Sequence, residues 1–333
     1  MHKAAQIKRK NEGRKAMRTM AIDRFGDKEP LRTVDLPKPE AGPGQVIVRV
    51  RAAGVGYWDV MACQGLFGEM ELPYVPGFET AGVVEQVGSG VTDLAVGDEV
   101  YAFDFPGGGY AEYRAVSANA ASHKPASLSY EEAAGVPVAG LTAHQGLTEV
   151  LGLQKGETIL VTAAAGGVGT FATQIASRLF DARVIGTASP GNHTYLEELG
   201  AAAAVDYGED DWPAAVREAA GGPVDAVLDC AGGVMVPEIL VQCFEAVRDG
   251  GRVAYIPSLE MEPENEPTPP KGISLRFFGV KPDAERLKEL TGFFDDRWLT
   301  VHLQEILALE EAARAHEHIE AGHTRGKIVL RTD

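Results

Sequence analysis

The sequence predicts an α/β protein of two domains, one built on a doubly wound parallel sheet and the other mainly β, barrel-like and discontinuous in the chain. Strand and helix candidates alternate regularly between residues 157 and 257. Before residue 125 the chain instead contains short strand candidates separated by glycine and proline turns. One isolated strand candidate stands at the C-terminal end. These three observations lead to the predicted architecture.

The N-terminal part holds four strand candidates. Each is short, alternates apolar with polar residues and is bounded by turn residues; they cover residues 45–54, 80–90, 98–103 and 108–116. Runs of this kind, punctuated by glycine and proline, are typical of antiparallel sheets and barrels. We therefore expect an antiparallel, barrel-like domain.

The pattern changes after Ser129. Ser129 and Glu132 have the spacing of a capping box, which predicts a helix that runs toward Gly140. The strand candidates that follow are apolar along their whole length, which indicates a parallel sheet covered by helices on both faces. They cover residues 157–163, 183–188, 202–207, 224–230, 252–257 and 273–278, with helix candidates at 168–180, 192–200, 212–220 and 236–247.

The tail contains two helix candidates, at 283–294 and 309–322, and ends in the strand candidate 327–331. A single strand has no sheet of its own to join, so we expect it to return to the first domain. The predicted organisation is a leader of residues 1–16, a first domain of residues 17–138 and 279–333, and a second domain of residues 139–278.

Length and composition exclude several classes of protein. The 333 residues suffice for about two domains with a sizeable core. Hydrophobic residues make up 45% and charged residues 24%, which fits neither wholesale disorder nor a membrane bundle. The formal net charge of −17 repels phosphate backbones and disfavours a general nucleic-acid binder. The three cysteines, Cys63, Cys230 and Cys243, have no regular spacing, so we expect no disulfide framework and a cytoplasmic protein.

The leader differs from the rest of the chain in charge. Residues 1–16 carry six cations and one anion, a net charge of +5, and lack the apolar core of a signal peptide. We interpret them as a disordered extension before Met17. The sequence leaves open whether it is a leftover of cloning or an upstream start, an organelle-targeting segment, or a basic arm.

A glycine-rich turn at residues 164–169 follows a predicted strand and opens a predicted helix. It has the form of a dinucleotide fingerprint with alanine at the first glycine position. Gly166 would let the backbone approach a pyrophosphate, Gly169 would let the helix pack close to the strand, and the helix N-terminus would favour the negative charge. The expected cofactor-binding residues of this turn are Ala164, Gly166, Gly167, Val168 and Gly169.

The end of the second parallel strand indicates which dinucleotide would bind. An acidic residue there accepts hydrogen bonds from the ribose 2′-hydroxyl and repels a 2′-phosphate. This chain has Thr187, Ala188 and Ser189, followed by Asn192 and His193. NADPH is therefore favoured over NADH, with Ser189 and Asn192 as cofactor-binding residues. Both side chains are also suited to capping the next helix.

Seven motifs, taken in order, carry a family resemblance. They are AAGVGYWDVMACQG (from Ala52), LPYVPGFETAGVVEQVGSGV (from Leu72), VGDEVYAF (from Val96), GGGYAEY (from Gly107), AGLTAHQGL (from Ala139), AAAGGVG and GHTRGKIVL (from Gly322). With them the chain resembles the medium-chain dehydrogenase/reductase superfamily and is most similar to its zinc-free quinone oxidoreductases and enoyl reductases. The resemblance covers nearly all of residues 17–333. It implies a Rossmann domain, a GroES-like domain, and a homodimer joined through the cofactor domains.

The resemblance also bears on metal and reaction. Zinc alcohol dehydrogenases of this superfamily carry a cysteine where this chain has Gly56, and a histidine where it has Phe78. Neither glycine nor phenylalanine can ligate zinc, so we expect no metal. Without one, the implied chemistry is hydride transfer from NADPH to an electron-poor small molecule, either a quinone or an α,β-unsaturated carbonyl.

Individual roles follow from the motif matches. Tyr57, in a loop facing the nicotinamide, is the tentative catalytic residue. The further cofactor-binding residues are Thr142 near the nicotinamide, Tyr207 at the adenosine phosphate, Cys230, Ala231 and Gly232 beside the ribose, and Arg325 and Lys327 from the tail.

The identity of the proton donor stays open. Many zinc-free members have Asn at the position of Gly56 and Tyr at the position of Met61, and this chain has neither. Tyr57 is then either a donor or a wall of the nicotinamide pocket. Asp59 is either a polar candidate or a structural hydrogen-bonding residue.

Aromatic residues are concentrated in loops and strand ends expected at the domain cleft, which suggests a flat, apolar substrate. The predicted pocket residues are Tyr57, Phe103, Phe105 and Phe278, while Phe78 is the candidate most suited to the core. His316 and His318 lie two positions apart on a helix, off a common face, and we expect both to face solvent.

Three hypotheses about function remain. The first is an NADPH-dependent, zinc-independent reductase of quinones or activated enones, with the cofactor between two domains. The second is a cofactor-binding redox sensor or structural protein with little turnover. The third is a biosynthetic enoyl-thioester reductase acting on a carrier-bound chain, which would need a basic entry patch that this acidic composition does not indicate.

Overall fold

The six-stranded sheet is parallel throughout. The computed structural model describes residues 15–26, 31–68, 70–231, 237–256 and 266–332. The strands of this sheet lie in the order β10 (Ala203–Val205), β9 (Arg183–Thr187), β8 (Thr158–Val161), β11 (Val224–Asp229), β12 (Val247–Tyr255) and β13 (Ser274–Phe277). The chain order runs outward from β8 in both directions, so the predicted doubly wound sheet is confirmed.

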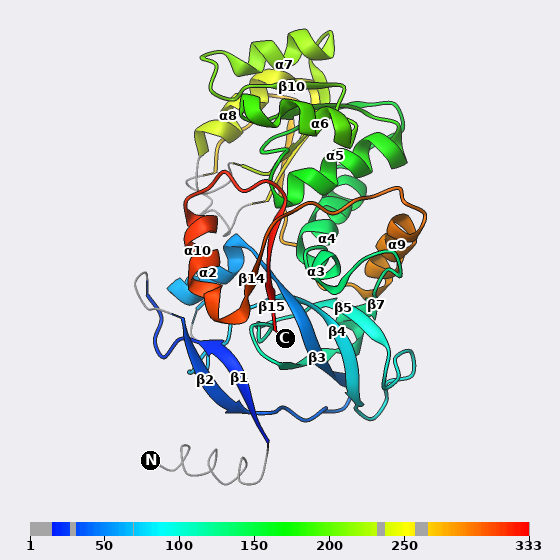
Figure 1. Ribbon diagram of the computed structural model, residues 1–333. Coiled ribbons are helices and arrows are strands. Elements are labelled where there is room, and N and C mark those ends of the chain that lie inside the picture. Colours follow the sequence, from blue (N-terminus) through cyan, green and yellow to red (C-terminus); the bar gives the residue numbers. More distant parts are fainter. Residues whose placement is uncertain (1–14, 27–30, 69, 232–236, 257–265, 333) are drawn as a thin grey trace.

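Both faces of this sheet are buried, because neighbouring residues of one strand pack into different apolar clusters. Ile159 and Val161 pack in the cluster that contains Phe171, whereas Leu160 between them packs in the cluster that contains Trp212. This explains strands that are apolar along their whole length. The first cluster includes α5 (Gly167–Phe180) and α6 (His193–Leu199), and the second includes α7 (Trp212–Ala220) and α8 (Pro237–Ala246). Figure 1 shows these helices around the sheet in the upper half of the molecule.

The second large sheet is open. Its order is β14 (Leu303–Ala308), β15 (Lys327–Arg331), β3 (Gln45–Val55), β4 (Glu79–Val87), β5 (Glu99–Phe103) and β7 (Ala121–His123), with β6 (Tyr113–Ser117) also paired to β3. The expected mainly β domain is confirmed, but the described strands form no closed barrel. On β3, β4 occupies one edge, and the other edge is divided between β6, at residues 45–49, and β15, at residues 52–55. Closure would need β6 to pair with β7, but among the described residues β6 pairs with β3 and β7 pairs with β5.

The tail strand returns to this sheet, as expected. Ile328 of β15 pairs with Val55 of β3, and Arg331 pairs with Ala52. A separate two-stranded sheet joins β1 (Ala16–Ala21) to β2 (Arg32–Pro37). Among the described residues the first element begins at Ala16, one residue before Met17 and inside the predicted leader; residues 1–14 of the leader lie outside the described part. The domain boundaries themselves stay a prediction.

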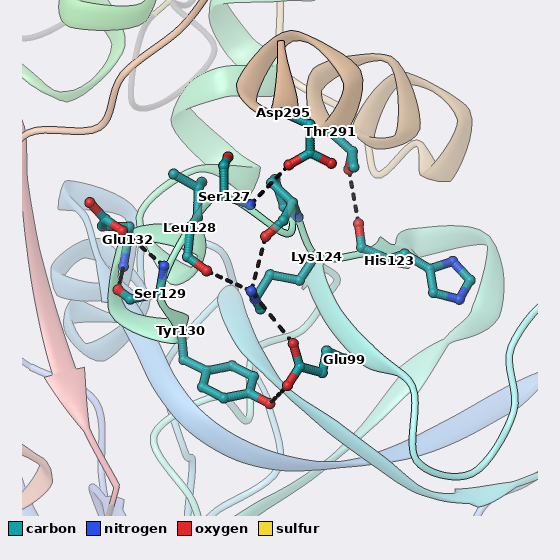
Figure 2. A network of polar contacts seen from close by, with 11 residues as sticks. Glu99, His123, Lys124, Ser127, Leu128, Ser129, Tyr130, Glu132, Thr291 and Asp295 are labelled. Atoms are coloured by element: carbon teal, nitrogen blue, oxygen red, sulfur yellow. Dashed lines mark hydrogen bonds and ion pairs between the residues drawn. The ribbon is translucent and has the colours of Figure 1, made fainter. Parts of the chain in front are cut away.

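A polar network fixes the joint between this sheet and the helices that follow it (Figure 2). The ammonium of Lys124 donates to the carbonyl of Pro125 at 2.9 Å, and the Ser127 amide donates to Asp295 at 3.0 Å. The predicted capping box is present: the Glu132 amide donates to the Ser129 hydroxyl at 3.1 Å, and the Ser129 amide donates to the Glu132 carboxylate at 2.8 Å.

The helix opened by this box is shorter than expected. It ends at Ala134, and a new helix begins at Pro137, which has no amide hydrogen and is favoured at a first helical position. The remaining helices are α2 (Tyr57–Gln64), α3 (Tyr130–Ala134), α4 (Pro137–Gln145), α9 (Ala284–Asp295), α10 (Ala312–Glu320) and the short η1 (Ala118–Ala120), η2 (Gly146–Val150), η3 (Pro190–Asn192) and η4 (Leu309–Glu311). Over the described residues, we find no helix with the length and apolarity to cross a membrane.

The expectation that His316 faces solvent was wrong. Its side chain is buried, and Nε2 lies 3.2 Å from the Tyr110 hydroxyl. Burial lowers the pKa of His316 to about 4, so the ring is neutral at pH 7 and Nε2 can accept the Tyr110 hydrogen. His318, two residues on, is about one third exposed and lies beside Glu305. Helix spacing alone did not reveal that α10 packs against Tyr110.

We expect this histidine to make stability depend on pH. The unfolded chain protonates His316 near pH 6.5, whereas the folded chain protonates it only near pH 4, so stability is lost as pH falls through this window. Between pH 7.5 and pH 5, the free energy of unfolding should fall by about 2 kcal/mol more in the wild type than in His316→Gln. Urea titrations at both pH values measure this, and an equal fall in the two proteins would contradict it.

Candidate active site

A cavity of about 470 Å³ lies at the carboxyl ends of β8 and β11. These neighbouring strands are where the sheet order reverses, which is the usual ligand position in doubly wound sheets. Its lining comes from the end of β3, from α2, the start of β4 and α4, from the turn after β8, from the segments after β11, β12 and β13, and from the tail between Ile319 and Lys327. The cavity thus joins residues from both sheets and from both ends of the chain.

The glycine-rich turn forms one wall of this cavity. Gly166, Gly167, Val168 and Gly169 line it where α5 begins. A Cβ at Gly169 would stand 2.3 Å from the carbonyl oxygen of Ala163, so only glycine allows this approach of helix to strand. The first-turn amides of a helix have no intrahelical partner and favour an anion. The turn therefore fits a dinucleotide pyrophosphate.

Ala164, the remaining predicted residue of the turn, does not line the cavity. Its side chain is buried beneath the turn, and a Cβ at Gly186 of β9 would meet the Ala164 Cβ at 2.9 Å. Ala164 therefore acts through packing between β8 and β9. The left-handed backbone of the turn is at Ala163, whose φ is 44°.

The loop after β9 is held by a residue from the tail. Arg325 Nε donates to the Asn192 side-chain oxygen at 2.6 Å, and its Nη2 donates to the Gly191 carbonyl at 3.0 Å. The Asn192 amide group in turn donates to the Ser189 hydroxyl at 3.2 Å. Neither Ser189 nor Asn192 makes a side-chain capping bond. A guanidinium and two small polar side chains are therefore grouped at this strand end, outside the cavity lining.

Of the other predicted cofactor-binding residues, some line the cavity and others do not. Thr142 lines the cavity and donates its hydroxyl hydrogen to the Val138 carbonyl at 2.6 Å. Cys230 and Ala231 line it as well. Tyr207 is 47% exposed and is not part of the lining. Gly232 lies outside the described residues.

The predicted aromatic pocket is brought together only in part. Tyr57 and Phe278 line the cavity, and so does the buried Phe78. Phe103 is fully buried and Phe105 is exposed, and neither lines the cavity. Phe103 on β5 belongs to the large apolar cluster that also contains Phe171 of α5, which accounts for its burial.

Sequence reasoning missed a buried ion pair at the cavity wall. Lys327 Nζ lies 2.7 Å from Glu79 Oε1 and donates to the Val55 carbonyl at 3.0 Å. The second oxygen of Glu79 accepts the Val138 amide at 2.7 Å. Both side chains are under a tenth exposed and line the cavity. The signal available at both positions was a charged residue at the start of a strand whose next residues carry no charge.

Asp59 is the third charged group of this wall. Its carboxylate accepts the amides of Gly56 at 2.8 Å, Gly77 at 2.9 Å and Phe78 at 3.2 Å. Burial raises the pKa of Asp59 to about 6, the nearby Glu79 charge adds to this, and the Gly56 amide and Lys327 oppose it. These bonds tie α2 to the start of β4, so the geometry supports the structural role for Asp59.

The wall provides no set of metal ligands. A Cβ at Gly56 would stand 3.8 Å from Lys327 Nζ, so the cation faces the position where the zinc enzymes of the resembled family place a cysteine. Within the described residues there is no group of three or more His, Cys, Asp or Glu side chains arranged for a metal ion. The residues present do not fit a zinc site.

Removal of Lys327 should leave Glu79 buried without compensation. We expect Lys327→Met to lower the free energy of unfolding by about 3–5 kcal/mol, and Lys327→Met combined with Glu79→Gln to lower it by less, because no net charge is then buried. Urea denaturation measures both. The exposed pair of Arg32 with Asp23 supplies a control, since Arg32→Met should cost about 1 kcal/mol or less. Equal losses in the single and double variants would contradict the argument.

Comparisons with known proteins agree with this architecture. A model of the alcohol dehydrogenase GroES-like domain matches residues 42–126, and a model described as zinc-binding dehydrogenase matches residues 199–330. The chain is 31% identical over 338 residues to a quinone oxidoreductase-like protein 2 homolog of Nematostella vectensis, covering 96% of this chain and 90% of that protein.

Solved structures give the same result. A structure of an NAD-dependent alcohol dehydrogenase has a TM-score of 0.86 and 33% identity, covering 95% of this chain and 100% of that one. A mycobacterial protein complexed with NADPH has a TM-score of 0.83 and 31% identity, with the same coverage. With its Gly56 and Phe78 in place of zinc ligands, the chain belongs to the medium-chain dehydrogenase/reductase superfamily, in the zinc-free quinone oxidoreductase branch, and is an oxidoreductase.

Proposed function

We propose that this protein is an NADPH-dependent, zinc-independent reductase of quinones or α,β-unsaturated carbonyls. The observation that carries the proposal is one cavity lined both by the glycine-rich turn and by apolar side chains such as Trp58, Val138 and Phe278. A dinucleotide on the turn would extend toward an apolar compartment that suits a flat, uncharged acceptor. The relative from Nematostella vectensis, described as quinone oxidoreductase-like, supports this acceptor class.

The chain's own part in the reaction is position and electrostatics. The bound nicotinamide would supply a hydride from C4, and the acceptor would take that hydride together with one proton. The first turn of α5 binds the pyrophosphate, and Thr142 and Phe278 bound the compartment beside it. Lys327 Nζ lies at the wall of this compartment, and Glu79 and the Val55 carbonyl engage two of its three hydrogens, so the third would be able to donate to an acceptor oxygen on which charge develops.

Tyr57 is our proposed proton donor. Met61 stands where many zinc-free members carry a tyrosine, and its side chain is fully buried. Tyr57 is the only phenol among the described residues that line the cavity, and its hydroxyl makes no hydrogen bond to a described residue. A free phenol at this wall is able to donate to the acceptor oxygen.

The proposal of NADPH rests on the loop after β9. Residues 187–193 contain no carboxylate, and Arg325 is anchored to this loop through Asn192. A guanidinium pairs well with a phosphate. The mycobacterial relative complexed with NADPH supports this preference, whereas the relative described as an NAD-dependent alcohol dehydrogenase does not.

We also propose a cytoplasmic homodimer joined through the parallel-sheet domains. β13 is the last strand of its sheet, and Phe277 on it is 37% exposed, which suits an interface there. The three cysteines are free, as a reducing compartment would keep them.

A turnover assay tests the proposed function. Purified protein should oxidise NADPH in the presence of quinones and short enones, with saturation in both reactants. Tyr57→Phe should lower kcat by about 100-fold, because a general acid contributes on that scale, while the dissociation constant for NADPH stays within about twofold of the wild type. Product analysis should find one hydroquinone or saturated carbonyl for each NADPH consumed.

Saturable NADPH binding without turnover on any acceptor would instead favour a redox sensor or structural protein. Turnover confined to carrier-bound enoyl thioesters would favour a biosynthetic reductase.

Cofactor preference should depend on Ser189. A carboxylate in Ser189→Asp repels the 2′-phosphate, so the KM for NADPH should rise about 10- to 100-fold while that for NADH changes less than about threefold. Ser189→Ala is the matched control, since it removes the hydroxyl without adding charge. Steady-state kinetics with both coenzymes measures this. Parallel losses for NADH and NADPH would show that the 2′-phosphate does not bind beside Ser189.

A further inference from the structure

Five aromatic side chains form a continuous group beside the cavity, and we call them the aromatic cluster: Trp58, Phe67, Phe78, Phe103 and Phe105. They come from α2, from the segment that follows it, from the residue before β4, and from the end of β5 and the loop beyond. Their ring centroids lie 5.2 to 6.2 Å apart in seven contacts. Such distances are those of tilted or edge-to-face packing.

The cluster leads from the cavity to the surface. Trp58 and Phe78 line the cavity. Phe67 and Phe105 each contact both of these rings, and they are 37% and 46% exposed. Phe103, fully buried, supports Trp58 and Phe105 from below. One side of the cluster is thus in the cavity and the other is in solvent.

The partial exposure of Phe67 and Phe105 indicates a role other than packing in the core. Single apolar residues on a surface need no explanation, but exposed ones that pack on the same cavity-lining rings indicate a binding surface. Phe67 and Phe105 belong to segments far apart in the chain and meet on the same two cavity-lining rings. Leu66, next to Phe67, is 48% exposed and extends the apolar surface.

We propose that the aromatic cluster is an outer subsite that holds an unbranched hydrocarbon tail of the acceptor while its reducible head occupies the cavity. This inference rests on the proposed function and specifies its substrate class. The cluster contains no charged or hydrogen-bonding side chain except the indole of Trp58, so it suits an uncharged chain rather than a phosphopantetheine arm or an acidic peptide.

A series of 2-alkyl-1,4-benzoquinones of increasing chain length, at concentrations where each stays monomeric, tests the proposal. With NADPH saturating, kcat/KM of the wild type should rise about two- to fourfold for each added methylene, until the chain passes Phe105. In Phe67→Ser with Phe105→Ser, this rise should flatten to below about 1.5-fold per methylene, since the apolar contact is removed. Phe67→Leu with Phe105→Leu should keep most of the rise.

The control is Trp298→Ser, which removes another exposed aromatic ring, 48% exposed, whose stacked partner is Phe293 and which belongs to neither the cavity nor the cluster. It should keep the wild-type dependence on chain length. If no quinone of any length is reduced, the proposed function fails. If the unsubstituted quinone is reduced but chain length has no effect, or if the serine variant keeps the full rise, only the outer subsite is overturned. Light scattering measures whether the serine variant loses self-association. If it does, and the dependence on chain length stays intact, the cluster is an interface between copies of the protein and the proposal is likewise overturned.

Discussion

The buried ion pair of Lys327 with Glu79 is the interaction on which the arrangement of the site depends. It joins the tail strand β15 to β4, and it also engages the Val55 carbonyl at the end of β3 and the Val138 amide at the start of α4. α4 carries Thr142, and the methylene stem of Lys327 would lie 3.2 Å from a Cβ at Gly167 in the glycine-rich turn. One pair of opposite charges therefore contacts both α4 and the glycine-rich turn, which line the cavity together.

Burial of this pair requires space that only glycine leaves. A Cβ at Gly54 would stand 2.4 Å from Glu79 Oε1, and also 2.5 Å from the carbonyl oxygen of Ala134. At Gly56 the missing side chain opens the wall toward Lys327. The end of β3 and the residue before α2 thus leave the space in which the paired charges lie.

The tail acts at two places separated by one residue. Lys327 is buried in the cavity wall, whereas Arg325 reaches the loop after β9 and contacts Asn192. Because β15 pairs with β3 of the open sheet, these two contacts connect the two sheets across the cavity. The position of the tail therefore affects both the proposed phosphate contact and the compartment for the acceptor.

Sequence patterns determined the features that depend on near neighbours. The apolar strands from residue 157 on predicted a parallel sheet, the Ser129 and Glu132 pair predicted a helix start, and the turn at residues 164–169 predicted a helix N-terminus at the sheet edge. Each is decided by residues within a few positions of one another, through backbone geometry or alternation of burial. The zinc-free assignment could also be made from the sequence, because it depends on which side chains stand at the positions of Gly56 and Phe78.

Only the tertiary structure decided which distant residues meet. The described residues of β6 and β7 do not pair, which leaves the predicted barrel open, and packing of α10 against Tyr110 buried His316. The pairing of Glu79 with Lys327 and the grouping of Phe67 with Phe105 on Trp58 belong to the same class. A local pattern records how polar a position is, but the partner that neutralises a buried charge or covers a ring comes from another part of the chain. That choice is made when the two sheets and the tail pack together.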